Sequence, residues 1–233
     1  MLILKSILIL LIAYLIGSIP FGLIVVKLKT GQDIRKIQSG RTGGTNAMRA
    51  AGLWAGIVTA ALDILKGAAG VWIASAFFAD DSSDPALLWL KVLAPVAAIL
   101  GHNYSIFLLH RDETERRIRF HGGAGGAPAV GGALGLWAPS ILIILPVGAL
   151  IFFGIGYASI TTMSVALIAL IIFAVRAALD LGPWLFVLYG VLAELLLLWA
   201  LRPNIRRLFN GTERLVGWRA RRLEEQNKQP GAR

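Results

Sequence analysis

The sequence predicts an all-α integral membrane protein with seven transmembrane helices. Of its 233 residues, 57% are hydrophobic and only 15% are charged, and the mean hydropathy is +0.72. A soluble domain carries about 25% charged residues, so this composition excludes an ordinary soluble fold. Long apolar runs alternate with short polar segments along the chain, which is the pattern of one compact bundle of spans. The absence of cysteine excludes disulfides and thiolate chemistry.

The expected spans follow the apolar runs in chain order. They are residues 2–28, 50–78, 87–109, a short small-residue span that ends near Trp137, and residues 140–157, 161–179 and 184–201. Pro20 lies within the first run and removes a helix hydrogen bond, so we expect a kink or break there. We expect residues 1–209 to form a single domain. A basic tail, 210–233, follows it and is expected to be disordered from Glu224 onward.

The positions of Lys and Arg predict the orientation of the bundle. Residues 29–49, 110–121 and 202–233 hold most of the 23 Lys and Arg residues, whereas the 79–86 loop holds only acidic charges. With seven spans, the positive-inside rule places the N-terminus outside and the C-terminus in the cytoplasm. The net charge of +10 is then explained by topogenic loops and anionic lipid, and we expect no nucleic acid as a partner. The motif-bearing cytoplasmic loops are expected at 29–49, 110–126 and 202–213.

The most informative polar segment is SGRTGGTNAMR, residues 39–49. Glycines such as Gly43 and Gly44 let backbone N–H groups approach a ligand closely, and consecutive N–H groups form an anion-binding nest. We expect a helix to begin near Thr45 or Asn46 and to add the partial positive charge of its N-terminus, while arginine matches the geometry of phosphate. The segment therefore predicts a phosphate site at a membrane surface. The alternative is a basic, glycine-rich loop that only determines topology.

Asp63 and Lys66 lie inside the second span, on one helical face, at a spacing that lets them pair. A charge in the middle of a bilayer costs at least about 2.5 kcal/mol, so such residues usually face the bundle interior and often have a function. The alternative is a purely structural ion pair. His102 and Asn103 lie near the end of the third run. Histidine suits proton transfer near neutrality, although a lone histidine often only completes a hydrogen bond.

Three further segments are polar or rich in glycine. GGAGGAPAVGG, residues 122–132, predicts either a close-packed helix of small residues or a second backbone cradle. The segment before it, HRDETERRIRFH at 110–121, mixes charges of both signs and predicts a solvated loop. From Arg202 the tail reads RPNIRRLF, a basic amphipathic pattern typical of a helix on a membrane surface.

Six motifs, in order, resemble the acyl-phosphate:glycerol-3-phosphate acyltransferases of bacterial membranes, the PlsY family. They are GSIPFG at Gly17, SGRTGGTNAMR at Ser39, DILKG at Asp63, GHNYSIFL at Gly101, GGAGG at Gly122 and NIRRLFNGTE at Asn204. The resemblance implies a seven-span protein of the bacterial inner membrane. It implies transfer of a fatty acyl group from acyl phosphate to the 1-hydroxyl of glycerol 3-phosphate, which forms lysophosphatidic acid in phospholipid synthesis. It also implies membrane lipids as partners, and no metal, cofactor or acyl-CoA.

The same resemblance implies roles for individual residues. The expected catalytic residues are Ser39, Arg49, Lys66 and His102. The expected substrate- and phosphate-binding residues are Gly43, Gly44, Thr45, Asn46, Gly122, Gly123, Gly125, Asn204 and Glu213. Acyl phosphate is already activated, so positioning and charge stabilisation can support transfer without a protein nucleophile. A covalent role for Ser39 is the less favoured alternative, because the sequence ties no activating base to it.

Three positions depart from the pattern of that family. Arg41 stands where asparagine is usual, Ala124 where the second glycine motif has lysine, and Leu201 where the last motif has histidine. The charged segment at 110–121 also looks like an insertion. Both missing side chains concern contacts with phosphate or with the acceptor. We hypothesise that the missing charge is supplied by Arg41 or by an arginine of the insertion, which holds Arg116, Arg117 and Arg119.

Two other classes of function remain open. One is a catalytically altered paralogue that binds an anionic lipid or metabolite, or acylates a different acceptor. The other is a small transporter, suggested by Asp63, Lys66 and Glu194 inside the bilayer and by broken helices. Inverted repeats would favour a transporter, and the sequence shows none. An enzyme is favoured if one pocket gathers Ser39, Arg49, Lys66 and Asn204.

Overall fold

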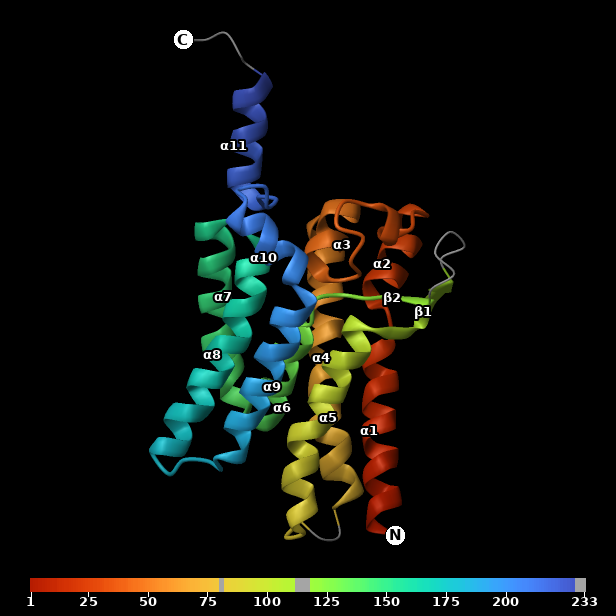
Figure 1. The fold of residues 1–233 in the computed structure, drawn as a ribbon, viewed down its shortest axis with the longest axis vertical. Coiled ribbons are helices and arrows are strands. Elements are labelled where there is room, and N and C mark those ends of the chain that lie inside the picture. The colour runs from red at the N-terminus through yellow and green to blue at the C-terminus, as the bar shows by residue number, and fades with distance from the viewer. Residues whose placement is uncertain (80–81, 112–117, 229–233) are drawn as a thin grey trace.

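The protein is a bundle of long, roughly aligned helices (Figure 1). The computed structural model describes all residues except 80–81, 112–117 and 229–233. The α-helices are α1 (Leu2–Ser18), α2 (Phe21–Thr30), α3 (Gly44–Ala51), α4 (Leu53–Phe77), α5 (Pro85–Asn103), α6 (Gly126–Leu136), α7 (Ile141–Ile155), α8 (Ala158–Ala178), α9 (Leu185–Ala200), α10 (Arg202–Phe209) and α11 (Gly217–Lys228). The other elements are the 3₁₀ helices η1 (Ile34–Lys36) and η2 (Ala138–Ser140) and the strands β1 (Ser105–Arg111) and β2 (Ile118–His121).

Within the described residues, five helical segments are long and apolar enough to cross a membrane. They are α1 with α2, α4, α5, η2 with α7, and α8. A sixth results if α9 and α10, which meet at 66°, form one broken span. Helix α6 has 11 residues, or about 17 Å of helical rise, and is therefore shorter than a hydrocarbon core of about 30 Å and not among these segments. The predicted helical bundle is confirmed, whereas the count of seven spans and the orientation of the termini stay predictions.

The expected break in the first apolar run lies at Ile19 and Pro20, between α1 and α2. Carbonyl groups at the end of a helix lack intrahelical partners. Here the Ile19 carbonyl accepts a hydrogen bond from Lys66 Nζ at 2.9 Å, and the Ser18 carbonyl accepts one from Ser105 Oγ at 2.5 Å. A cation at the negative end of the helix dipole is favourable. The break therefore provides the point at which α4 and β1 dock onto the end of α1.

The third apolar run is shorter as a helix than we expected, because α5 ends at Asn103 instead of continuing to Leu109. Tyr104 leaves the helical region, with φ of −131° and ψ of 67°. The following residues form β1, which pairs antiparallel with β2 and places Leu109 opposite Phe120. The segment expected to be a solvated loop supplies this partner strand. Pairing with it takes the β-favouring residues after Tyr104 out of the helix.

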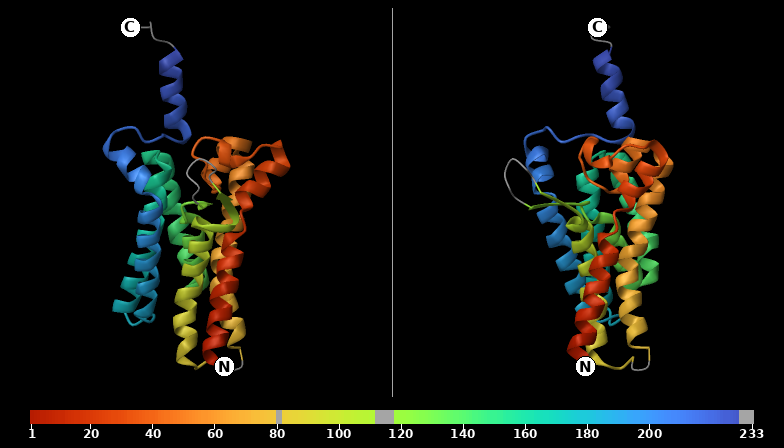
Figure 2. Two further views of the ribbon diagram at one scale, coloured as in Figure 1. Left: turned by 45° about the vertical axis from the view of Figure 1, so that its right-hand side comes forward. Right: turned by 90° about the vertical axis from the view of Figure 1, so that its right-hand side faces the viewer.

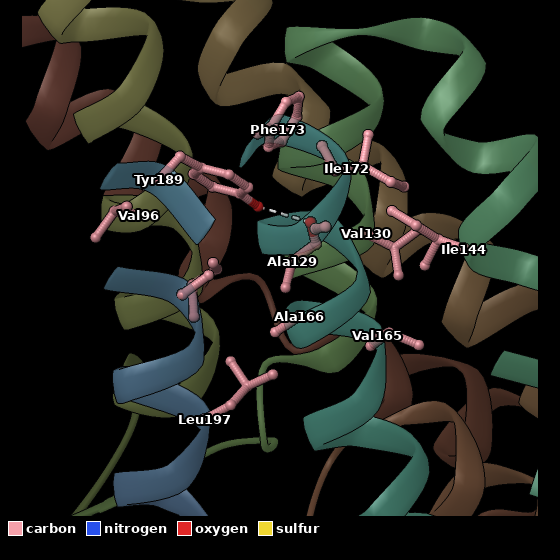
Figure 3. Packing of buried hydrophobic residues seen from close by; sticks show 14 of the residues in the cluster. Val96, Ala129, Val130, Ile144, Val165, Ala166, Ile172, Phe173, Tyr189 and Leu197 are labelled. Carbon is pink, nitrogen blue, oxygen red and sulfur yellow. Dashed lines mark hydrogen bonds between the residues drawn. The ribbon is translucent and has the colours of Figure 1, made fainter. Parts of the chain in front are cut away.

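Small residues bring the short helix α6 close to its neighbours. Figure 3 shows the main core cluster, in which the buried Tyr189 of α9 donates a hydrogen bond to the Ala129 carbonyl of α6 at 2.6 Å. A Cβ atom added to Gly131 would overlap the Ile64 carbonyl of α4. Such contacts between backbones are typical of helix packing in membranes. Helix α6 is therefore held inside the bundle, although its rise is shorter than the hydrocarbon core is thick.

The polar segments meet at the end of the bundle opposite the N-terminus (Figures 1 and 2). There α2, η1 and α3 pack around the fully buried Val26, Ile34 and Ala47. Helix α11 projects beyond the bundle from the same end. Residues 224–228 belong to this helix, so our expectation of disorder from Glu224 onward was wrong for them, while residues 229–233 lie outside the described residues.

The close packing of α6 predicts a matched pair of glycine variants. Gly131→Ala is expected to lower the thermal unfolding temperature, because its methyl group overlaps the Ile64 carbonyl and overpacking costs about 1–3 kcal/mol. Gly154→Ala is the control, since no atom lies within 4 Å of its added Cβ. Alanine is also the better helix former there, by about 1 kcal/mol. Thermal melts in detergent test the pair, and equal melting temperatures for the wild type and Gly131→Ala would contradict this packing.

Candidate active site

A cavity of about 210 Å³ lies at the polar end of the bundle. Its walls come from segments that are far apart in the sequence, from the loop before α3 to the segment after α10. Ten of the residues expected to form the site line it: Ser39, Gly43, Gly44, Thr45, Asn46, Arg49, His102, Gly125, Asn204 and Glu213. Three others, Lys66, Gly122 and Gly123, lie outside its lining.

The N-terminus of α3 forms one wall. Asn46 holds the preceding loop closed, because its Nδ2 lies 3.2 Å from the Ile34 carbonyl, 3.0 Å from that of Ile37 and 2.9 Å from that of Arg41. Asn46 therefore shapes the cradle through its side chain. Within the described part of the chain, the backbone N–H groups of Gly44 and Thr45 have no hydrogen-bond partner. They are free to receive an anion, as expected at the start of a helix.

Arg49 presents a half-buried guanidinium to the cavity. None of the described residues forms a hydrogen bond or an ion pair with it. Burial lowers its pKa from the ordinary value, nearby Arg214 lowers it further, and Glu213 opposes both effects. An arginine stays charged at neutral pH despite such a shift. Arg49 is therefore a partly desolvated cation with a free planar fork, which suits a phosphate.

Arg41 is more deeply buried than Arg49, and its hydrogen bonds join three segments. It donates to the Gly123 carbonyl at 3.3 Å, to the Ala200 carbonyl at 2.7 Å and to Asn204 Oδ1 at 3.1 Å. Burial lowers the pKa of Arg41, and repulsion from Arg207 adds to this effect. Arg41 thus brings a positive charge to the segment that holds Ala124, where the family pattern has lysine.

Glu213 is the acidic centre of this network. It accepts hydrogen bonds from Asn204 Nδ2 at 2.8 Å, from Arg207 Nε at 2.9 Å and from Ser159 Oγ at 3.2 Å. Asn204 is therefore fixed from both sides, by Glu213 at its nitrogen and by Arg41 at its oxygen. The expected binding residues Asn204 and Glu213 are thus brought together with the first glycine-rich loop.

Asp63, Lys66 and His102 are each at most 5% exposed. Lys66 Nζ lies 2.9 Å from Asp63 Oδ1, so the pair expected from the sequence is present. His102 Nδ1 lies 3.6 Å from the same oxygen, which is too long for a hydrogen bond. Asp63 and His102 line the cavity, but Lys66 does not. Lys66 is therefore placed to hold Asp63 and the end of α1, and it acts on the cavity through Asp63.

The second glycine-rich motif wraps around His102. Gly123 N–H donates to the His102 carbonyl at 2.9 Å, and Thr42 N–H donates to the Gly122 carbonyl at 3.2 Å. A Cβ on Gly122 would overlap the His102 carbonyl, and one on Gly123 would overlap His102 Nε2. These two glycines permit close approach to the histidine. Of the three glycines expected to bind substrate in this motif, Gly122, Gly123 and Gly125, only Gly125 lines the cavity; its φ is +88°.

Several lining residues were not anticipated from the sequence. Arg207 and Arg214 lie in the tail, whose basic pattern we interpreted as a membrane-surface helix. The available signal was that Arg207 lies within the last motif, which ends at Glu213, and that Arg214 directly follows it. Ser159, at the start of α8, lies near none of the sequence motifs, so the sequence gave no signal for it. Ala124 and Leu201 also line the cavity, without a polar group.

Two interpretations of the sequence depend on details of the first loop and the insertion. Ser39 is exposed at the cavity, and its Oγ accepts a hydrogen bond from Arg41 N–H at 3.4 Å. Within the described ranges no base contacts Ser39 Oγ, so the structure adds no support for a nucleophilic role. Arg116 and Arg117 lie outside the described residues, as does the side chain of Arg119.

Similarity to known proteins extends over almost the whole chain. The sequence profile of a family described as glycerol-3-phosphate acyltransferase matches residues 7–211. Glycerol-3-phosphate acyltransferase 3 of Dehalococcoides mccartyi is 34% identical over 229 residues, which cover 95% of this chain and all of that protein. A glycerol-3-phosphate acyltransferase of Thermus thermophilus is 38% identical over 212 residues, which cover 91% of this chain and 95% of that protein.

Two solved structures share the fold. Both are crystal structures of PlsY (YgiH), an integral membrane glycerol 3-phosphate acyltransferase. The glycerol 3-phosphate form has a TM-score of 0.75 and 31% identity, covering 91% of this chain and 96% of that one. The lysophosphatidic acid form has a TM-score of 0.73 and 29% identity, covering 91% and 95%. These matches, together with the cavity at the polar end of the bundle, show that the chain belongs to the glycerol-3-phosphate acyltransferase family.

Proposed function

We propose that the chain transfers a fatty acyl group from acyl phosphate to the 1-hydroxyl of glycerol 3-phosphate and so forms lysophosphatidic acid. The observation that carries this proposal is the one cavity that gathers Ser39, Arg49 and Asn204 at the polar end of an apolar bundle. The related crystal structures, in glycerol 3-phosphate and lysophosphatidic acid forms, support both the acceptor and the product.

The proposal extends to the location and topology of the chain. Bacterial relatives support the bacterial inner membrane as the location. We propose seven spans within a single domain, residues 1–209, with the cavity facing the cytoplasm. The concentration of Lys and Arg in the polar segments supports that orientation. Acyl phosphate could then reach the cavity from the lipid, and glycerol 3-phosphate from the cytoplasm.

In the proposed reaction, the acceptor hydroxyl oxygen attacks the acyl carbonyl carbon. The new ester bond forms as the bond from that carbon to the phosphate oxygen breaks, and inorganic phosphate leaves with the electron pair. We assign the hydroxyl proton to His102. This role as general base is supported by its position in the cavity lining and by the 3.6 Å between its Nδ1 and Asp63 Oδ1. The Gly44 and Thr45 N–H groups and Arg49 would stabilise the charge that grows on the leaving phosphate.

Arg41 is proposed to replace the lysine that the second glycine motif lacks. Its guanidinium reaches the backbone beside Ala124 and contacts Asn204, the residue expected to hold the acceptor. A cation beside Asn204 supports this proposal. The competing proposal is an acceptor other than glycerol 3-phosphate, which is favoured by the apolar Ala124 and Leu201 in the cavity wall.

The first test is transfer of labelled glycerol 3-phosphate into lipid by purified protein, with palmitoyl phosphate as donor. Arg49→Ala is expected to lower kcat/KM about 100-fold, because charge-assisted hydrogen bonds are each worth about 1.5–3 kcal/mol. Arg206→Gln, an exposed change outside the cavity, is the control and should retain activity. A folded wild-type protein that forms no product from glycerol 3-phosphate would sink the proposed acceptor.

The role of Arg41 predicts an effect on acceptor binding. Arg41→Ala should raise the KM for glycerol 3-phosphate by about tenfold, because one charge-assisted contact is lost. Arg41→Lys keeps the charge without the fork and should recover part of that loss. The alternative source of this charge is the insertion, and a variant with alanine at Arg116, Arg117 and Arg119 tests it. If it raises KM while Arg41→Ala does not, the insertion supplies the charge instead.

The contact between Gly123 and His102 predicts a defect in turnover. Gly123→Ala should lower kcat by up to about 100-fold with a smaller change in KM, because its methyl group displaces the imidazole. If Gly123 acts through His102, adding His102→Gln to this variant should cost little more than His102→Gln alone. Additive losses in the double variant would instead show that Gly123 acts by another route.

A further inference from the structure

The chain that follows the last motif is anchored to the end of α7, beside which α11 begins (Figure 1). Carbonyl groups at the end of a helix lack intrahelical partners. Here three of them accept hydrogen bonds from the start of α11 and the residue before it. The pairs are Val216 N–H with the Gly156 carbonyl at 2.8 Å, Trp218 Nε1 with the Phe153 carbonyl at 2.7 Å, and Arg219 Nη1 with the Ile155 carbonyl. We call residues 215–219 the clamp.

The clamp lies directly beside the wall of the cavity. Leu215 pairs with Tyr157 in an antiparallel β-bridge at the turn between α7 and α8. In an antiparallel pair, the next residues on the same face lie two positions along each chain. Here these residues are Ser159 and Glu213, which both line the cavity, and Ser159 Oγ donates to Glu213 Oε1 at 3.2 Å. The clamp and this part of the wall therefore form one continuous contact between the tail and the start of α8.

Glu213 connects the clamp to the polar network of the cavity. Its side chain is 6% exposed and accepts hydrogen bonds from Asn204 and Arg207. If this carboxylate moved, both donors would lose a charge-assisted hydrogen bond. The clamp residues are all described, and none of them lines the cavity. Any effect of the clamp on the reaction must therefore act through the residues that it holds in place.

The clamp also lies outside the part of the chain that the family profile matches, which ends at residue 211. We propose that Trp218 and Arg219 are positioning residues, which hold Glu213 in the cavity wall so that Glu213 presents Asn204 to glycerol 3-phosphate. This inference rests on the proposed function for the identity of the acceptor. The anchoring itself is measured without any reaction.

The kinetic test compares the wild type with the double variant Trp218→Phe/Arg219→Gln, which removes both side-chain donors of the clamp. Its KM for glycerol 3-phosphate should rise about tenfold, because Asn204 loses a charge-assisted hydrogen bond that orients it. The KM for palmitoyl phosphate and kcat should change little. Arg222→Gln is the matched control and should behave as the wild type does, because Arg222 is exposed on the same helix and forms no hydrogen bond with a described residue.

A second test uses the absence of cysteine from the chain. Tyr157→Cys and Leu215→Cys together place two thiols at a bridge where paired Cα atoms lie about 4.5–5.5 Å apart, a separation that suits a disulfide. Mild oxidation should join them at least about tenfold faster with the clamp intact than with Trp218→Phe/Arg219→Gln added, because two hydrogen bonds no longer hold the tail in place. The disulfide should then restore the KM that these two substitutions raised, and reduction should raise it again.

The outcomes distinguish this inference from the proposed function. A wild type that forms no product from glycerol 3-phosphate overturns the proposed function, while faster crosslinking with the clamp intact still supports the anchoring. Product formation with an unchanged KM in Trp218→Phe/Arg219→Gln, or equal crosslinking rates, overturns the inference alone. A KM that stays high after the disulfide has formed also overturns it. Melting temperatures show whether each variant is folded, and Trp218→Phe alone replaces the double variant if that variant is not.

Discussion

The architecture of the site depends on the buried pair formed by Asp63 and Lys66. Removing two charges from water is costly, and only close pairing with further hydrogen bonds offsets that cost. Lys66 meets this need with Asp63 on one side and the Ile19 carbonyl on the other. One side chain thereby connects the broken end of α1, the middle of α4 and, through Asp63, the histidine of α5. Loss of either partner would leave an unpaired charge beneath the cavity floor.

Around this pair, glycine has two different roles. In the first loop, the backbone itself can serve as a binding surface, because Gly44 and Thr45 line the cavity and their N–H groups have no partner among the described residues. In the second motif, Gly122 and Gly123 let the chain pass directly over His102. The two motifs are then joined by Thr42 N–H and the Gly122 carbonyl, at 3.2 Å. The two glycine-rich motifs therefore look alike in the sequence, but each needs glycine for a different physical reason.

Much of this arrangement could be predicted from the sequence, for reasons that differ from one element to the next. The apolar runs identified α4, α7, α8 and α9 because hydropathy depends on composition alone. Pro20 located the break in the first run because its effect is local. The end of α5 could not be placed, since residues after Asn103 leave the helix only when a distant strand pairs with them. The roles of Arg41 and Ser159 likewise depend on partners more than 50 positions away.

The cavity draws its first wall from Ser39 and its last from Arg214, so it spans most of the chain. Glu213, which fixes Asn204, is among the last residues needed. During synthesis the N-terminal part of a chain emerges and folds first. Nearly every helix must therefore be synthesised and inserted before the walls can close. A prematurely ended chain would carry the first loop and the buried pair into the membrane without a working site, so the order of assembly itself prevents partial products from acting.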